Sequence, residues 1–371
     1  MLLITCPFWL ASLLTTELKR LGIKPIDSFP NGCRVEDSSR ENILRINIHS
    51  RIANKVFQQV STWLVTSFED LFQLTQRIDR SQHIQQNQAF RISATTIWSI
   101  LHAERTVQSI AHKWIVTQLT WSKDKQWLSN DTYDQLDVYV YINNNVAHIL
   151  KNTSGESLHK RWRRVTQWDA PIKENLAVAT LLSASRPFSQ ALRDPCCGSG
   201  TLLIEAARLA KNMAPGWDKN FAFESFPDFP EDTFHDILKQ AQEKEIHKSW
   251  TIIWSDNNQD MLEKARKNAK EAWVDDIISF VFHDIRKPNK HPDLQWPTTV
   301  ICNPPYDQRL QDHDTKNIHY QLASLIQQPG WNGAVISWYE EAADSFPPKT
   351  WKRKETRQGK EVCYIRVPKR K

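Results

Sequence analysis

The sequence predicts an α/β protein whose C-terminal part is built on an open sheet. Three observations lead to this prediction. A short apolar segment ends at Asp194 and passes through a glycine turn into an Ala- and Leu-rich segment, the pattern of a strand, a turn and a helix. Two later apolar segments also end in an acid, at Asp256 and Asp284. A further buried-strand pattern, residues 298–302, runs into an Asn-Pro-Pro-Tyr motif. Acids at the carboxyl ends of neighbouring strands are typical of α/β sheets that bind a ligand at that edge.

Composition describes a soluble globular chain with room for two or three domains. The chain has 371 residues, of which 40% are hydrophobic and 24% charged, and a net charge of +6. Its six cysteines show no C-x-x-C spacing, which argues against a zinc site and a secreted disulfide framework, so we expect no metal. The apolar start, residues 2–14, is too short to cross a bilayer and lacks a basic leader. We therefore expect a cytoplasmic protein that does not engage a membrane.

Residues 1–56 have the pattern of a small α/β unit. Residues 2–6 read as a strand, followed by a helix that runs to Arg20 and is stopped by Gly22. Two short strands are expected near residues 32–36 and 44–48.

Residues 57–152 predict a second small α/β unit. Residues 67–74 read as a helix with Phe68, Leu71 and Phe72 on one face. A strand at 89–94 and a helix at 104–119 follow. Two strands, 138–142 and 146–150, then form a hairpin around three asparagines, a residue that tolerates the left-handed turn conformation.

A basic connector follows at residues 151–165. Lys160, Arg161, Trp162, Arg163 and Arg164 place four cations and one indole in five residues. Such a run is either a solvated linker or a contact to an RNA backbone with a ring for base stacking.

The rest of the C-terminal part contains an aromatic insertion and a basic end. Phenylalanines cluster in the insertion 214–248, where we expect core packing rather than base contact. Helices are expected at 261–273 and 316–327, and strands at 251–254, 277–282, 334–338 and 362–367. Residues 349–371 carry ten Lys and Arg against two Glu, a local charge of +8 that exceeds that of the whole chain. Localised positive charge points to an anionic polymer as partner.

The glycine turn favours a cationic, nucleoside-like ligand. Gly198 and Gly200 lie two apart in a chain with nine glycines, ahead of a helix whose N-terminus carries free N–H groups. An ordinary strand-to-helix turn has the same pattern. However, the third glycine of the dinucleotide fingerprint is missing, and the acid before the turn disfavours a pyrophosphate. S-adenosylmethionine carries an ammonium and a sulfonium and no phosphate.

The Asn-Pro-Pro-Tyr motif suits a planar amine. Pro304 and Pro305 fix the backbone and remove two N–H donors, so carbonyls are presented without competition. Asn303 supplies an amide acceptor and Tyr306 a ring that can stack on a base. A rigid turn with a packed tyrosine is the alternative.

Together these motifs resemble a family, the bacterial THUMP-domain RNA methyltransferases that modify guanine N2, and within it the 23S rRNA guanine-N2 methyltransferases. The resemblance rests on residues 194–207 and 303–306, with further matches at 154–161 and 170–177. It covers nearly the whole chain. This sequence departs from the family, which usually has Gly-Tyr, Gly and Gly, at Trp162-Arg163, Trp254 and Asp307.

The resemblance implies three domains. These are a ferredoxin-like domain at 1–56, an RNA-binding THUMP domain at 57–152, and a Rossmann-like class I methyltransferase domain with a mixed seven-stranded sheet at 153–371. Catalysis is assigned to Asn303, Pro304 and Tyr306. The cofactor, S-adenosylmethionine, is assigned to Asp194, Cys196, Gly198, Gly200, Thr201, Asp256, Asp284 and Asn303. Substrate binding is assigned to Pro305, Tyr306, Lys160, Arg161, Arg163 and Arg164.

The expected reaction is methyl transfer from S-adenosylmethionine to the exocyclic N2 of a guanine in RNA. The expected RNA is 23S rRNA, with tRNA as the second candidate. Two other classes stay open: an adenine-N6 methyltransferase on nucleic acid, because the same motif suits any exocyclic amine, and a non-catalytic RNA-binding or assembly factor. The sequence identifies neither the nucleotide nor the oligomeric state.

Overall fold

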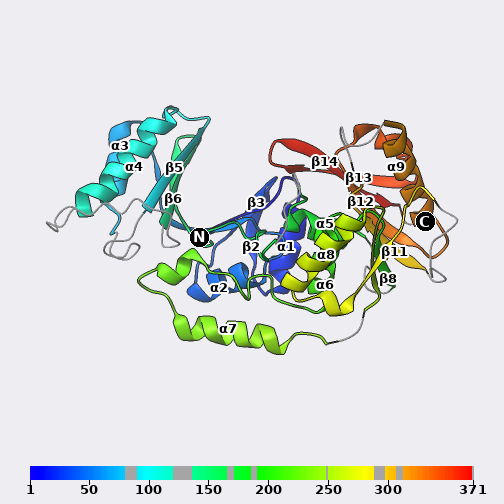
Figure 1. Ribbon diagram of the computed structural model, residues 1–371. Helices are drawn as coiled ribbons and strands as arrows, with labels where there is room; N and C mark the ends of the chain where they lie inside the picture. Colours follow the sequence, from blue (N-terminus) through cyan, green and yellow to red (C-terminus); the bar gives the residue numbers. More distant parts are fainter. Residues whose placement is uncertain are drawn as a thin grey trace.

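The computed structural model describes residues 1–79, 90–119, 136–164, 171–184, 190–247, 250–287, 297–305 and 312–369. In this part of the chain two seven-stranded sheets lie side by side, the first from the N-terminal half and the second from the C-terminal half (Figure 1). The strands of the first sheet are β1 (Leu2–Thr5), β2 (Pro25–Phe29), β3 (Gly32–Val35), β4 (Lys55–Leu64), β5 (Phe90–Ile97), β6 (Leu136–Asn143) and β7 (Val146–Asn152). Those of the second are β8 (Ala191–Asp194), β9 (Ile252–Asp256), β10 (Ile278–Phe282), β11 (Thr298–Cys302), β12 (Asn332–Ser337), β13 (Trp351–Gln358) and β14 (Glu361–Pro368).

Nine helices pack around these sheets in the described ranges. They are α1 (Ala11–Arg20), α2 (Arg40–His49), α3 (Phe68–Gln76), α4 (Glu104–Leu119), α5 (Glu174–Ser183), α6 (Thr201–Ala210), α7 (Glu231–Glu243), α8 (Gln259–Glu271) and α9 (Asp312–Ile326). None of the helices in these ranges is long and apolar enough to cross a membrane.

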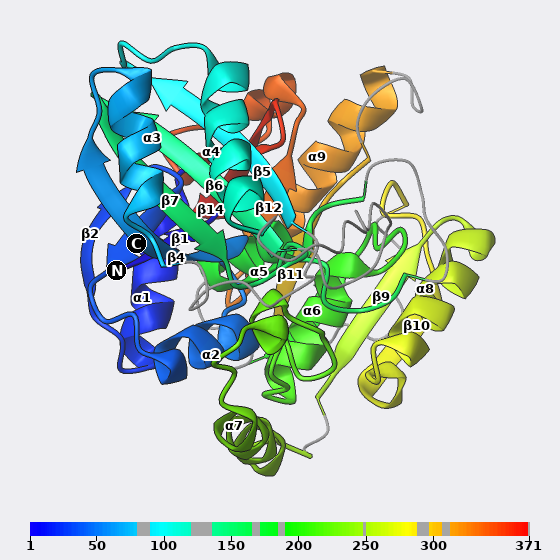
Figure 2. The same cartoon turned by 90° about the vertical axis from the view of Figure 1, so that its left-hand side faces the viewer.

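The first sheet joins two units through one long strand. Its order is β2-β3-β1-β4-β7-β6-β5. The first four strands with α1 and α2 form the expected ferredoxin-like arrangement. β4 pairs with β1 over Lys55–Gln58 and with β7 over Phe57–Leu64. The boundary expected between residues 56 and 57 therefore lies inside a continuous strand. α3 and α4 lie over the far strands of this sheet (Figure 2).

The second sheet has the expected mixed seven-stranded, Rossmann-like form. Its order is β10-β9-β8-β11-β12-β14-β13, in which β14 runs antiparallel to β12 and β13 and the other pairings are parallel. Alternate residues of β11 face opposite sides. Ile301 joins the core cluster that contains α5, α6 and α8, whereas Val300 and Cys302 join the cluster that contains α9. Both faces are therefore covered, and the carboxyl edge of the parallel strands is left for a ligand.

Several expected elements are confirmed, among them α4, the hairpin β6–β7 and the helix after the glycine turn. The strand expected at 44–48 is wrong, because this segment is part of α2. Ser39 caps α2 by accepting a hydrogen bond from the Asn42 N–H, and Ile43, Leu44 and Ile46 are buried. The local β-branched residues favour a strand, but the Ser39 cap and the burial of one face stabilise a helix here. β2, β4 and β13 were not anticipated.

The α3 helix is confirmed, but its inner face differs from the expected one. Leu71, Leu74 and Thr75 are buried, while Phe68 in the first turn is 38% exposed. Ser67 and Asp70 form a capping box that fixes the helix start.

The aromatic insertion packs, as expected, but against the N-terminal half. Phe221, Phe223 and Phe234 form stacked and edge-to-face pairs with ring centroids 4.9 to 6.4 Å apart. The Phe223 N–H donates to the Thr153 carbonyl at 3.0 Å, and α7 contacts α2 (Figure 1). The insertion therefore ties the second sheet to the first.

Candidate active site

A cavity of about 320 Å³ lies at the carboxyl edge of the second sheet. Arg193 of β8 lies opposite Val300 of β11, and Asp194 of β8 lies opposite Trp254 of β9. The residues that follow these parallel strands therefore come together. Nine of the residues expected from the sequence line this cavity: Asp194, Cys196, Gly198, Thr201, Asp256, Asp284, Asn303, Pro304 and Pro305. Tyr306 lies outside the described residues.

The glycine turn is held against the end of β9. Gly198 has a φ of 51°, and its N–H donates to Asp256 Oδ2 at 3.0 Å. The Cys197 N–H donates to the Ser255 carbonyl at 3.0 Å. The Asn258 N–H donates to the other oxygen, Asp256 Oδ1, at 3.0 Å, so the turn and the second acid are positioned as one unit in which both oxygens of Asp256 already accept a backbone N–H.

Gly200 is not among the residues that line the cavity, and it packs against β9. It has a φ of 91° and precedes the first residue of α6. A Cβ at this position would lie 2.2 Å from a ring carbon of Trp254, which is fully buried at the centre of β9. The indole therefore occupies the space that the missing side chain leaves.

We expect Gly200→Ala to destabilise the protein by about 1–3 kcal/mol, because it combines a left-handed backbone with overpacking. Urea unfolding monitored by tryptophan fluorescence measures this. Gly359→Ala is the matched control, since Gly359 also has a positive φ (66°) but nothing lies within 4 Å of its Cβ position. Equal losses in both variants would show that the contact with Trp254 is unimportant.

The three acids differ in their surroundings. Asp194 is buried, and its Oδ1 accepts from the Cys196 N–H at 3.0 Å; burial raises its pKa to about 7. Burial also raises the pKa of Asp256. The pKa of Asp284 is lowered by hydrogen bonds from the Arg286 guanidinium, whose Nη2 lies 2.8 Å from Oδ2.

Asn303 offers an unused acceptor. It follows the last residue of β11, lines the cavity, and its Oδ1 is buried without a hydrogen-bond partner among the described residues. Such an orphaned acceptor costs free energy unless a ligand satisfies it. The site therefore fits a ligand with an N–H or O–H donor beside Pro304.

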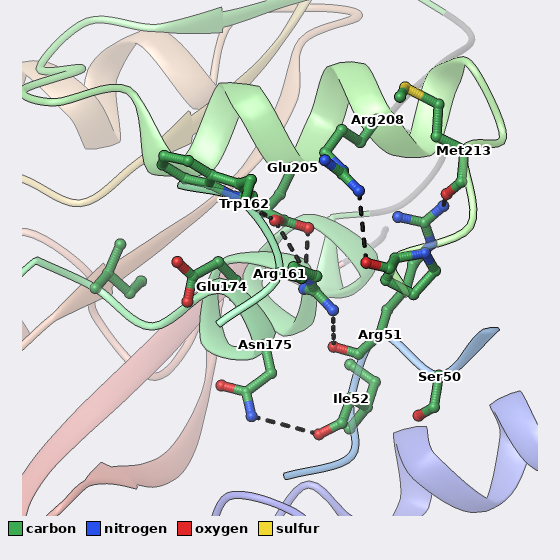
Figure 3. Close-up of polar contacts among 12 residues, drawn as sticks. Ser50, Arg51, Ile52, Arg161, Trp162, Glu174, Asn175, Glu205, Arg208 and Met213 are labelled. Carbon is green, nitrogen blue, oxygen red and sulfur yellow. Dashed lines mark hydrogen bonds and ion pairs between the residues drawn. The ribbon is translucent and has the colours of Figure 1, made fainter. Parts of the chain in front are cut away.

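The basic connector divides into buried and exposed residues. Arg161 is buried and pairs with Glu205, with Nη2 2.9 Å from Oε2, and the Trp162 Nε1 donates to Glu205 Oε1 at 3.0 Å (Figure 3). The expectation that Arg161 contacts RNA and that Trp162 offers a stacking ring is therefore wrong. The negative charge that holds them lies in α6, 43 residues away or more, which a reading of the local run did not consider.

The other connector cations remain accessible to different degrees. Arg164 is largely buried and pairs with Glu174 at 2.6 Å. Lys160 is exposed and pairs with Glu156 at 2.7 Å, and Arg163 is exposed. The basic C-terminal segment is mostly ordered as the hairpin β13–β14, in which Arg366 is buried.

One residue that lines the cavity, Arg286, and one buried residue behind it, Arg193, were missed in the sequence. Arg286 binds Asp284 through its guanidinium, and an Asp-x-Arg pattern after a strand was the available signal. Arg193 is buried just before Asp194, and its Nη2 donates to Ser255 Oγ at 3.4 Å. No three His, Cys, Asp or Glu side chains in the described ranges gather as they would around a metal.

Comparison with known proteins agrees with this geometry. The sequence profile of the RMKL-like methyltransferase domain matches residues 161–366, and that of the RlmL ferredoxin-like domain matches residues 1–57. The chain is 28% identical over 368 residues to the putative RNA methyltransferase YpsC of Bacillus subtilis, covering 96% of this chain and 93% of the relative. It is 30% identical over 334 residues to the putative RNA methyltransferase slr0064 of Synechocystis, covering 87% and 83%.

A longer relative matches in part. The ribosomal RNA large subunit methyltransferase K/L of Vibrio cholerae is 30% identical over 310 residues, which are 82% of this chain but only 43% of that protein.

Solved structures share the whole architecture. The structure of SMU.472, a putative methyltransferase complexed with SAH, superposes with a TM-score of 0.86 at 25% identity, covering 99% of this chain and 97% of that one. A predicted N6-adenine-specific DNA methylase from Listeria monocytogenes superposes with a TM-score of 0.85 at 27% identity, covering 98% and 95%. On the profile match and the extent of these similarities, the chain belongs to the RMKL-like methyltransferase family, in which a ferredoxin-like domain precedes the methyltransferase domain.

Proposed function

We propose that this protein transfers a methyl group from S-adenosylmethionine to the exocyclic N2 of a guanine in RNA, with 23S rRNA as the substrate. The observation that carries the proposal is the buried Oδ1 of Asn303 at the cavity wall, which has no hydrogen-bond partner among the described residues. The relatives named as RNA methyltransferases support RNA as the substrate. The K/L relative supports the large-subunit RNA.

The residues present fit S-adenosylmethionine, which supplies an electrophilic methyl when bound. The cavity brings carboxylates from three strand ends to one place, and Arg286, the one Lys or Arg among the described residues that line it, is paired with Asp284 and Asp314. The cavity therefore favours a cation with hydroxyl and amine donors over a phosphate. Asp194 would hold the cationic end, Asp256 the ribose hydroxyls, and Asp284 the adenine amine. Cys196, Gly198 and Thr201 would surround the same group.

The amine of the substrate is positioned by the Asn-Pro-Pro-Tyr motif. Asn303 Oδ1 and the Pro304 carbonyl accept its two N–H groups, which directs the nitrogen lone pair at the methyl. The same acceptors stabilise the positive charge that develops on the nitrogen during transfer. Alignment supplies most of the acceleration. We assign Tyr306 to stacking on the base, with Pro305 beside it, after the base has left its stack.

We further propose that residues 1–56 form a ferredoxin-like domain, that residues 57–152 form a THUMP domain that binds RNA, and that residues 153–371 perform catalysis. The profile match at 1–57 supports the first assignment. Lys160 and Arg163 of the connector are proposed as RNA contacts, whereas Arg161 and Arg164, which pair with Glu205 and Glu174 inside the protein, are not.

The direct test is to delete the gene and compare the nucleosides of rRNA and tRNA by mass analysis. Loss of N2-methylguanosine from 23S rRNA, and its return on incubation with the purified chain and S-adenosylmethionine, is the expected result. Loss of N2-methylguanosine from tRNA instead would identify tRNA, and not rRNA, as the substrate. Unchanged nucleosides in both RNAs would contradict the proposal and favour a non-catalytic role.

Adenine N6 is the second candidate, because the Listeria structure of the same architecture is described as a predicted N6-adenine-specific DNA methylase. Loss of N6-methyladenosine in the same analysis, from RNA or from DNA, would establish it.

The raised pKa of Asp194 predicts pH-dependent cofactor binding. In the free protein, burial favours the neutral carboxyl, so this group's contribution to the free energy of unfolding decreases as pH rises from about 4 to about 7. A bound cation favours the carboxylate instead, so binding releases a proton. Affinity should increase about tenfold from about pH 6 to about pH 8.

Calorimetry with S-adenosylhomocysteine measures this dependence. The nearby charges of Asp256 and Arg193 raise and lower the pKa of Asp194, respectively, and both are kept in the control variant Asp194→Asn. We expect the variant to bind more weakly and to lack the tenfold increase. The same pH profile in both proteins would remove Asp194 from the cation's surroundings.

A further inference from the structure

A second cavity adjoins the catalytic one. Its volume is about 940 Å³, and it lies between the connector, the start of α5 and the loop before the aromatic cluster. We call it the connector cavity and define it by Glu156, His159, Lys160, Arg163, Lys173 and Lys219. Pro171 and Ile172 line both cavities, so a single wall separates them.

The connector cavity has an excess of positive charge. Six lysines and arginines line it against three acids, Glu156, Glu174 and Asp218. The acids are partly used, since Glu174 pairs with Arg164 and Glu156 pairs with Lys160 and Lys219. Within the described part of the chain, Arg163 and Lys173 have no carboxylate in ion-pair distance.

His159 is kept neutral by burial and by the surrounding positive charges, so it adds a neutral hydrogen-bonding group to the cavity. Burial, followed by the charges of Lys173, Arg161, Lys160 and Lys219, lowers its pKa to about 3. The imidazole is therefore neutral at physiological pH. Its Nδ1 is buried and has no partner among the described residues. A neutral imidazole in a cationic cavity suits a ligand that carries hydroxyls beside its negative charges.

The wall between the two cavities is held in place by the C-terminal hairpin. Gln358 of β13 accepts a hydrogen bond from the Lys173 N–H at 3.0 Å and donates to the Pro171 carbonyl at 3.3 Å. On the other side, Lys219 Nζ donates to the Lys160 carbonyl at 3.1 Å. The cations are thus attached to fixed backbone.

We infer that the connector cavity binds the ribose-phosphate backbone of unpaired nucleotides that flank the methylated base. This inference rests on the proposed function. A base that enters the catalytic cavity stays covalently attached to its flanking nucleotides. The phosphates of those nucleotides can therefore be bound by the cations of the adjoining cavity. Arg163 and Lys173 bind phosphates directly, and His159 hydrogen-bonds a ribose 2′-hydroxyl, the group that distinguishes RNA from DNA.

The test compares the full chain with its Arg163→Ala/Lys173→Ala double variant on an unmodified 23S rRNA transcript. We expect the KM for RNA to rise at least about tenfold and kcat to stay unchanged. In binding titrations of a single-stranded RNA oligonucleotide, log affinity decreases with log salt, and the magnitude of this slope should be smaller by about 1.4 in the double variant, because two phosphate contacts are lost. Lys239→Ala on the exposed face of α7 is the control and should behave like the wild type.

Other outcomes separate the two proposals. If the wild-type chain methylates the transcript and the double variant has the same KM and salt slope, the cavity does not bind the strand. If the wild-type chain methylates no RNA, the proposed function fails, and the oligonucleotide titration alone decides on the cavity: equal slopes overturn it. His159→Ala should reduce the preference for RNA over the same DNA sequence, and an unchanged preference contradicts the 2′-hydroxyl contact. Thermal melting of each variant verifies that it is folded.

Discussion

Asn303→Ala should transfer methyl about 10²- to 10³-fold more slowly than the wild type while binding S-adenosylhomocysteine with almost the same affinity. The reason is the isolation of the amide oxygen: Oδ1 is buried at the cavity wall without a partner in the described structure, so its hydrogen bond is reserved for a ligand. Removing one aligned electrostatic contact has an effect of this size in comparable sites.

Three further variants separate alignment from binding. Asn303→Asp keeps an acceptor and should retain part of the activity, whereas Asn303→Ala keeps none. Tyr306→Phe should be mild and Tyr306→Ala should act mainly on RNA binding, because stacking requires only the ring. Single-turnover rates at saturating cofactor measure the chemical step. A wild-type rate in Asn303→Ala would mean that the acceptor has no part in catalysis.

The motifs that a single segment carries could be read from the sequence. The turn between Asp194 and Thr201 and the strand before Asn303 need only local patterns, and the parallel order of the strands brings them to one edge. Contacts between distant segments could not be read. Trp254 fills the space above Gly200 across 54 positions, and nothing local signals it.

Contacts between distant segments also explain why the role of the basic connector, residues 160–164, could not be predicted correctly. A run of four cations indicates a nucleic-acid contact only if the cations reach solvent, and that depends on where the acids fold to. Glu205 lies on the inner side of α6, and Glu174 at the start of α5, so two of the four arginines and lysines are neutralised inside the protein. Arg163 and Lys160 stay exposed: Lys160 pairs with Glu156, which is itself exposed, and Arg163 has no carboxylate in ion-pair distance among the described residues.

Glu205 stabilises the junction of the two halves and should be the most sensitive position outside the active site. It binds Arg161 and Trp162, and Arg161 also donates to the Arg51 carbonyl at 3.0 Å, which reaches into the N-terminal half (Figure 3). Arg51 and Arg208 are buried in the same region. Removing the carboxylate leaves three buried guanidinium groups close together.

We expect Glu205→Ala to lower the free energy of unfolding by about 3–5 kcal/mol, because the remaining charge on Arg161 is buried and uncompensated. Glu205→Gln keeps the acceptor for Trp162 and should lose less. Glu156→Ala is the control: it breaks the ion pair with Lys160, in which the two side chains are 57% and 61% exposed, and a longer pair of 3.7 Å with Lys219. Because Lys219 Nζ keeps the Lys160 carbonyl as its acceptor, this variant should cost only about 1 kcal/mol. Urea midpoints measure all three.

If Glu205→Ala and Glu156→Ala unfold at the same urea concentration, the buried pair contributes no more than a surface pair. If Glu205→Ala is destabilised as expected, its cofactor affinity becomes informative as well. Glu205 lies one helical turn after Thr201 in α6, the helix that begins at the glycine turn. A loosened junction should therefore weaken cofactor binding in Glu205→Ala but not in Glu156→Ala, because only the first change reaches the helix that holds the turn.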